Sequence, residues 1–167
     1  MALSTFLKKR WVKWLLEILI FVVIFLVLRA YMQRNMVEGV APPIVATTLA
    51  QQSFDLSQQQ KPILVHFWAT WCGICKLEES SIESISQDYP VITIAMQSGS
   101  DQEIEAYLKE RGLSFPVIND QMSEWVRQYG VSGVPASFIV NSKGEIVSKE
   151  RGYSTEWGLR ARLWFAD

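Results

Sequence analysis

The sequence is poor in side chains that bind metals, with two cysteines and one histidine among its 167 residues. A structural zinc site takes four ligands, so an intrachain zinc site is disfavoured. The chain also lacks an excess of charge of either sign, because 16 basic residues are balanced by 17 acidic ones. Proteins that bind nucleic acid usually carry a basic excess, so this balance argues against a nucleic-acid partner.

The hydrophobic residues, 49% of the chain, are distributed unevenly and begin with one long run. Ile18–Leu28 is uninterrupted, and extending it back to Trp11 includes only two charged side chains, Lys13 and Glu17. A membrane-spanning helix takes roughly 20 mainly apolar residues, and a lysine near its end can extend the ammonium group to the interface. We predict a cytoplasmic N-terminus and transmembrane anchor over residues 1–31.

A cleaved signal peptide is the alternative, since it also has a basic start and an apolar centre. The residues after the run offer a poor cleavage site, because Arg29 and Tyr31 flank Ala30. Both interpretations export the remainder of the chain. Basic residues are more frequent before the run than after it, and the more basic flank stays in the cytoplasm. Those before it are Lys8, Lys9, Arg10 and Lys13, and those closely after it are Arg29 and Arg34.

The exported part is expected to hold a linker over residues 32–43, which ends in two prolines, and one domain over residues 44–167. Apolar β-branched runs predict buried strands, and helical spacing of apolar residues predicts the helices between them. The order is strand, helix, strand, helix, strand, helix, hairpin, helix. It predicts an α/β domain with a mostly parallel sheet, helices on both faces and an antiparallel edge. The expected elements are strands 62–68, 90–97 and 114–120, helices 73–89, 100–112, 121–130 and 154–165, and a hairpin over 135–152.

The two cysteines, Cys72 and Cys75, stand two residues apart between the first of these strands and the first helix. A thiol at a helix N-terminus in a Cys-X-X-Cys sequence has a pKa lowered from about 8.5 to roughly 3.5–7.5. Cys72 is then the nucleophile, and Cys75 is placed to resolve a mixed disulfide. A structural disulfide closing so short a loop gains little. Binding of Cu(I) by two soft thiolates stays open as an alternative.

The segment "ILVHFWATWCGICK" resembles the active-site strand and turn of the thioredoxin superfamily, and "YGVSGVPASFIVNSKGEIV" resembles its second signature. The intervening "SGSDQEIEAYLKERGLSFPVINDQ" resembles the extra segment of the TlpA/ResA-like branch. With the apolar run, the whole is similar to membrane-tethered TlpA-like proteins, and in particular to the suppressor-of-copper-sensitivity D type. The resemblance implies a thioredoxin-like fold, a mixed sheet flanked by helices, after an N-terminal transmembrane helix.

The resemblance also implies roles for individual residues. Cys72 matches the attacking cysteine, Cys75 the resolving cysteine, and Pro135 a cis-proline that packs against the disulfide. Val134 matches the residue whose backbone pairs with a bound substrate strand. The remaining residues expected to bind substrate are Trp71, Gly73 and Ile74.

Two positions depart from the thioredoxin pattern, since His66 replaces a buried aspartate and Ser80 replaces a helix proline. Strand alternation places Leu64, His66 and Trp68 on one face, which the resemblance puts beneath the cysteines. A neutral imidazole there can accept the proton of Cys75. The alternative is a core histidine with a hydrogen-bond partner and no part in proton transfer. Glu78, on the inner side of the helix, is interpreted as an ordinary surface carboxylate or as the match to a glutamate of the relatives.

These features together predict a thiol–disulfide oxidoreductase, anchored in the bacterial inner membrane by a single span with its catalytic domain in the periplasm. It would act on protein disulfides or thiols, and a membrane thiol–electron transporter would supply its electrons. Because the cysteines form the redox couple, neither a cofactor nor a metal is expected. Reduction of substrates is favoured over oxidation, since the Gly73–Ile74 dipeptide lacks the histidine that helps to make strong oxidants.

Overall fold

The computed structural model describes residues 2–166 and divides the chain after Arg34 into two units, each described by itself. The first unit is a single helix, α1 (Ala2–Gln33). Within it, Trp11–Gln33 is long and apolar enough to cross a membrane. This candidate span contains the apolar run on which the anchor was predicted.

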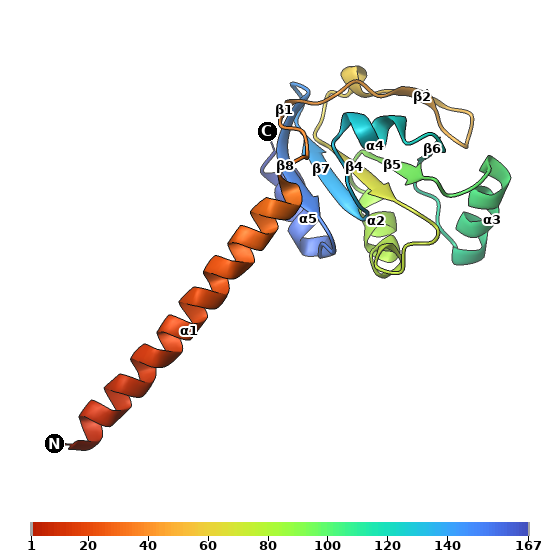
Figure 1. The fold of residues 1–167 in the computed structure, drawn as a ribbon. Helices are drawn as coiled ribbons and strands as arrows, with labels where there is room; N and C mark the ends of the chain where they lie inside the picture. The colour runs from red at the N-terminus through yellow and green to blue at the C-terminus, as the bar shows by residue number, and fades with distance from the viewer. Residues whose placement is uncertain (1, 167) are drawn as a thin grey trace. The chain divides into compact units, whose positions relative to one another are not determined.

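The second unit is built on a six-stranded mixed sheet with the order β1-β8-β7-β4-β5-β6 (Figure 1). Three strands are parallel to one another, namely β4 (Ile63–Trp68), β5 (Val91–Met96) and β6 (Val117–Asp120). Three pair antiparallel, namely β7 (Ala136–Val140), β8 (Glu145–Arg151) and β1 (Gly39–Val40). The hairpin β7–β8 adds an antiparallel side as expected, but the expectation of a mostly parallel sheet is wrong, because β7, β8 and β1 make up half of the strands.

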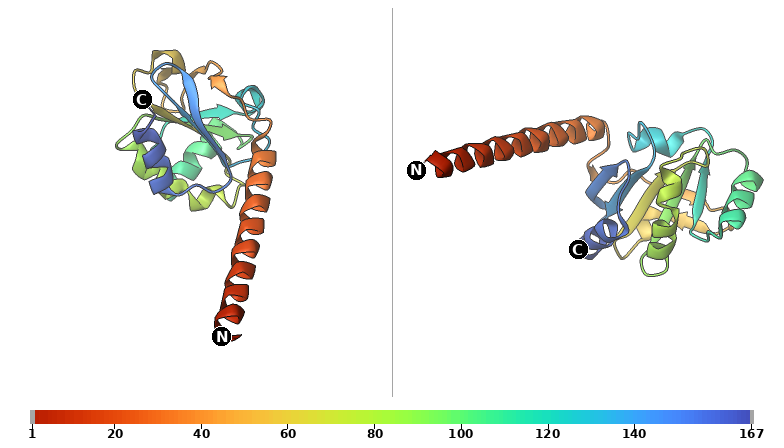
Figure 2. Two further views of the ribbon diagram at one scale, coloured as in Figure 1. Left: turned by 90° about the vertical axis from the view of Figure 1, so that its left-hand side faces the viewer. Right: turned by 90° about the horizontal axis from the view of Figure 1, so that it is seen from below.

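The helices cover both faces of this sheet (Figures 1 and 2). Side chains of α2 (Glu79–Ser86), α3 (Asp101–Arg111) and α5 (Glu156–Trp164) pack in the core cluster of one face, which also contains both cysteines. On the other face, α4 (Glu124–Gln128) packs with residues that precede β4. The thioredoxin-like α/β architecture expected from the sequence is confirmed.

Residues expected to form a linker belong largely to the folded unit. Met36 is buried in the second core cluster, and Gly39–Val40 forms β1 against β8. The division after Arg34 leaves a much shorter connection than residues 32–43. Two prolines at 42 and 43 do not prevent this, because the strand ends before them. A short hairpin of β2 (Val45–Thr47) and β3 (Ser53–Asp55) follows, and a 3₁₀ helix, η1 (Leu56–Gln58), leads toward β4.

The helix predicted over residues 73–89 is shorter and interrupted. It begins as a 3₁₀ turn, η2 (Cys75–Leu77), and continues as α2 only from Glu79. By contrast, the capping box of α3 is present as predicted: the Ser100 side chain accepts from the Glu103 N–H, and the Glu103 carboxylate accepts from the Ser100 N–H. That helix ends at Gly112 in the left-handed conformation.

Candidate active site

The two cysteines lie just beyond the carboxyl end of β4. All six residues of this strand are buried, which fits its apolar sequence and its place between β5 and β7. The chain leaves the sheet after Trp68 and turns back at Cys72, whose N–H donates to the carbonyl of Ala69. The turn brings Cys72 and Cys75 together at the start of η2.

Cys72 and Cys75 form a disulfide, with their Cα atoms 5.3 Å apart. The Cys75 N–H donates to the Cys72 sulfur over 3.1 Å. A donor at this distance stabilises a thiolate on Cys72 once the bond is reduced. Cys72 is 6% exposed and Cys75 1%, so the sulfur that another thiol can reach first is that of Cys72.

The loop before β7 lies against the disulfide. The Val134–Pro135 peptide bond is cis, as the sequence predicts. The carbonyl oxygen of Val134 is 3.6 Å from the Cys72 sulfur. The carbonyl of Pro135 accepts from the Gly152 N–H, which connects the loop to the end of β8. The structure thus brings together Cys72, Cys75 and the Val134–Pro135 pair, which are far apart in the sequence.

Apolar side chains around Cys72 are unusually exposed for their type. Trp71 is 59% exposed, Ile74 51% and Leu77 67%. The Trp71 indole N–H donates to the carbonyl of Gln97, which fixes the ring beside the disulfide. A side chain added at Gly73 would meet no atom within 4 Å. Trp71, Ile74 and Leu77 thus leave apolar surface open near the disulfide.

His66 is buried on the side of the sheet that holds the cysteines, as strand alternation predicts. The side-chain hydrogen bond of its ring, however, is made to Ser137. Its Nδ1 lies 2.9 Å from the hydroxyl of Ser137 on β7, the residue opposite it in the register. Burial lowers the pKa of the imidazole to about 3. His66 is therefore neutral at physiological pH and hydrogen-bonded within the core.

The sequence did not establish the role of Glu78. It follows Cys75 by three positions, its N–H donates to the Cys75 carbonyl over 3.0 Å, and it is 1% exposed. One carboxylate oxygen accepts from the Ser154 N–H. The other, Oε2, is buried and has no hydrogen-bond partner within the described residues. Burial raises the pKa of this carboxyl to about 7. The signals in the sequence were its position on the inner side of the helix and its match to a glutamate of the relatives.

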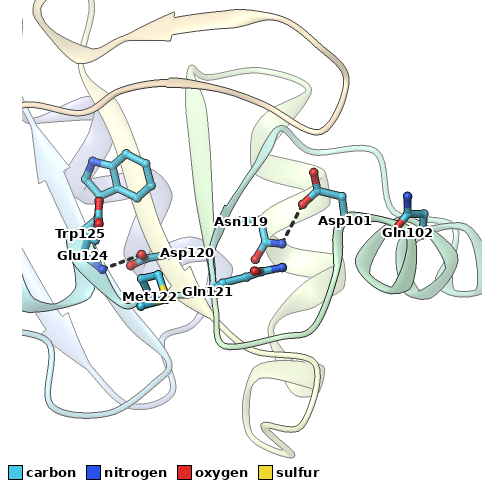
Figure 3. A pocket seen from close by; sticks show the side chains of 8 residues that line it. All are labelled: Asp101, Gln102, Asn119, Asp120, Gln121, Met122, Glu124 and Trp125. Atoms are coloured by element: carbon cyan, nitrogen blue, oxygen red, sulfur yellow. Dashed lines mark hydrogen bonds between the residues drawn. The ribbon is translucent and has the colours of Figure 1, made fainter.

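A polar pocket lies between the start of α3, the end of β6 and the start of α4 (Figure 3). Two of its three carboxylates are already engaged: Asp101 accepts from the Asn119 amide, and Asp120 accepts from the N–H groups of Glu124 and Val126. Across residues 11–166, whose side chains the structure describes, no three histidine, cysteine or acidic side chains are grouped so as to hold a metal ion. The hydrogen bonds of Asp101 and Asp120 shape the loops beside the site.

Comparison with known proteins places this arrangement in a family. The family model described as Redoxin matches residues 37–161. The chain belongs to the Redoxin family. A thioredoxin-like protein of Haemophilus influenzae is 30% identical over 140 residues, with 82% of this chain and 83% of the relative covered. Thiol-disulfide oxidoreductase ResA of Bacillus thuringiensis subsp. konkukian is 29% identical, with 74% of each chain covered.

Solved structures give the same result. The crystal structure of StoA from Bacillus subtilis aligns with a TM-score of 0.66 at 26% identity, covering 73% of this chain and 96% of that one. The same organism also has a protein that is similar to this chain in sequence, sporulation thiol-disulfide oxidoreductase A. As a Redoxin-family protein with a Cys72–Cys75 disulfide, this chain is a thiol–disulfide oxidoreductase.

Proposed function

We propose that this chain is a single-pass membrane protein that uses Cys72 and Cys75 to reduce disulfides of other proteins on the extracytoplasmic side. The observation that carries the proposal is the disulfide beside the Val134 carbonyl, bordered by exposed apolar side chains. The anchor is supported by α1: the 23 residues of its candidate span extend about 34 Å at 1.5 Å per residue, enough for a hydrocarbon core of about 30 Å.

In this proposal the reduced enzyme attacks through Cys72. The Cys72 thiolate forms a bond to one sulfur of the substrate disulfide, and the other substrate sulfur leaves as a thiolate. The Cys75 thiolate then attacks the Cys72 sulfur, which restores the observed disulfide and releases the second substrate thiol. Two electrons pass from the dithiol to the substrate. A membrane thiol–electron transporter is the proposed donor that reduces the pair again.

The second step requires Cys75, 1% exposed, to lose its proton. A thiol has a pKa of about 8.5, so transfer to Glu78, with a pKa of about 7, costs about 2 kcal/mol. Transfer to His66, with a pKa of about 3, costs roughly 7 kcal/mol. We therefore propose Glu78 as the proton acceptor and Oε2, which lacks a partner, as its accepting atom. His66 is then a core residue, in accordance with the alternative interpretation.

Substrate trapping tests the reaction. Cys75→Ser should accumulate mixed disulfides on Cys72, and Cys72→Ser should accumulate none, because only Cys72 makes the first attack. Equal trapping by both variants would contradict the assignment. The direction is tested by alkylating the thiols in intact cells: a mostly reduced pair supports a reductase, and a mostly oxidised pair supports an oxidase.

Copper binding is the other function to distinguish, since two thiolates can hold Cu(I). Retention of one Cu(I) per reduced chain, without any reductase activity, would favour a copper module and the suppressor-of-copper-sensitivity D type. Turnover of a disulfide substrate without bound copper would favour the oxidoreductase alone.

A further inference from the structure

The last helix, α5, has apolar residues on two opposite sides. Leu159 and Leu163 point into the core and are 1% and 2% exposed. On the outside, Trp157 is 83% exposed and Trp164 74%, and Phe165 directly after the helix is 80% exposed. Positions 157, 161 and 164 are neighbours on a helix surface. We call the exposed Trp157, Ala161, Trp164 and Phe165 the outer stripe.

The charged side chains of α5 are bound to other groups beside this stripe. Arg160 pairs with Glu156 and with Asp88, each within 2.8 Å. Arg162 pairs with Glu150 of β8 at 2.8 Å. Covering the outer stripe would therefore bury aromatic surface without separating these ion pairs. Contiguous exposed aromatic surface of this kind marks a contact with a partner or a membrane.

The place where the chain enters the folded unit indicates whether the outer stripe contacts a partner or a membrane. Helix α1 ends at Gln33, and Val37 already donates its N–H to the Tyr129 carbonyl in the folded unit. The carbonyl of Met36 accepts from Lys149 of β8 over 2.9 Å, and the next residue of that strand, Glu150, holds Arg162 of α5. Chain entry and α5 are thus both bonded to β8, the strand next to the edge strand β1, although they pack on opposite faces of the sheet. The two residues between Gln33 and Met36 span only about 7 Å when extended.

We propose that the outer stripe of α5 binds the lipid surface of the membrane in which α1 is anchored. The inference rests on the proposed anchor. Tryptophan and phenylalanine side chains are favoured at the membrane interface. A short tether raises the effective concentration of the surface at the stripe, so a weak contact is enough to be populated. Because the flanking charges are paired, binding should need neither anionic lipid nor low salt.

This contact would leave the redox site free. Trp164 lines a cavity with Lys61, Pro62 and Pro90, the residues that precede β4 and β5. The disulfide follows the other end of β4, so it lies at the opposite end of the sheet. Trp164, at the end of the stripe that is distant from Cys72, would hold that end of the domain on the lipid.

Hydroxyl-radical footprinting of the full chain, read by mass spectrometry, tests the proposal. The chain is placed in nanodiscs of neutral phosphatidylcholine and, for comparison, in an amphipol that covers α1 without offering a bilayer. In nanodiscs, oxidation of Trp157 and Trp164 relative to Trp71 should fall at least threefold, and 0.5 M salt should not restore it. An unchanged ratio in nanodiscs that contain the chain overturns lipid binding.

Other outcomes distinguish a failure of the anchor from a failure of lipid binding. Failure of the chain to enter nanodiscs overturns the anchor and lipid binding with it. Protection that is already present in amphipol and grows with protein concentration assigns the stripe to a second copy and overturns the proposal. In nanodiscs, Trp157→Ser with Trp164→Ser should expose Phe165 to oxidation, while the control Met122→Ser, at another exposed apolar residue, should leave it protected. Continued protection of Phe165 in the double variant counts against the stripe.

Discussion

Glu78 and His66 are both buried on the side of the sheet that holds the cysteines, and burial shifts their pKa values in opposite directions. Desolvation disfavours the charged form of each, so it raises the pKa of the carboxyl to about 7 and lowers that of the imidazole to about 3. Both are consequently neutral near pH 5. Their different pKa values make their contributions to stability and to proton transfer separable by experiment.

The first prediction concerns the stability of the domain. The pKa of Glu78 is about 7 when folded and 4.5 in its ordinary state, so the folded chain binds the extra proton between these values. The contribution of Glu78 to stability should therefore fall by about 3 kcal/mol as pH rises from about 4.5 to about 7, while the contribution of His66, whose pKa is lowered from 6.5, rises up to about pH 6.5 and offsets most of that fall. Glu78→Gln should remove the Glu78 share, so that the stability of this variant rises up to about pH 6.5, while Glu105→Gln, at an exposed carboxylate of α3, should behave like the unmodified protein. Thermal unfolding followed by near-ultraviolet circular dichroism measures both variants.

The second prediction concerns release of the mixed disulfide. Glu78→Gln should slow this step about 100-fold at neutral pH, the usual range for loss of a general base. Attack by Cys72 should change much less. The pH at which release becomes fast should rise from about 7 toward the thiol pKa of about 8.5.

His66→Leu is the matched comparison, because it removes the histidine that the sequence favoured. Its release rate should stay within a few-fold of the unmodified protein, since an imidazole with a pKa of about 3 is too weak a base. Stopped-flow measurement of the rates of attack by Cys72 and of mixed-disulfide release decides between Glu78 and His66. Slow release in His66→Leu with normal release in Glu78→Gln would return the role to His66.

At the scale of elements, α3 is joined to α2 by a cluster around Glu79. This carboxylate is 6% exposed and accepts hydrogen bonds from Tyr107 and Arg111, both on α3. The Tyr107 ring also packs against Trp68 at the end of β4, with centroids 5.7 Å apart. The cluster connects the segment between β5 and β6 to the helix that follows the cysteines.

The third prediction is that Arg111→Met destabilises the domain by about 2–4 kcal/mol, because it leaves the buried Glu79 without its cation. Adding Glu79→Gln to this variant should restore part of the loss, since the amide still accepts from Tyr107 and carries no charge. Urea unfolding of the two single variants and the double variant gives the coupling energy. Additive losses would show that the pair is not coupled.

Sequence patterns predicted the elements whose signals are local. The capping box at Ser100 and Glu103 marks the start of α3 without reference to the rest of the chain. β1 was not predicted, because it has two residues and forms only by pairing with β8. The redox role of the cysteine pair was predicted from its spacing and its place before a helix, and the cis-proline loop was predicted by resemblance. The burial of Glu78 depends on Ser154, 76 positions away, and no local pattern indicates that contact.

At the scale of the whole molecule, the arrangement of charge around one helix determines which compartment receives the redox site. A disulfide of this kind persists in an oxidising compartment and is rare in the cytosol. The candidate span is long and apolar enough for an anchor, and a signal sequence has the same character, but its cleavage would release a soluble domain. Anchoring and orientation are therefore tested together.

The fourth prediction is that protease added to intact spheroplasts digests the domain but spares a cytoplasmic marker. The reason is the basic flank Lys8–Arg10, which the positive-inside rule keeps in the cytoplasm, against only Arg29 and Arg34 beyond the span. Neutralising Lys8, Lys9 and Arg10 to glutamine should increase the fraction of protected domain, while Lys109→Gln, a matched change on α3, should not. Full protection of the unmodified chain would reverse the orientation. A soluble processed form in the absence of protease would show a cleaved signal peptide, and the outer stripe of α5 would then have no membrane of its own to bind.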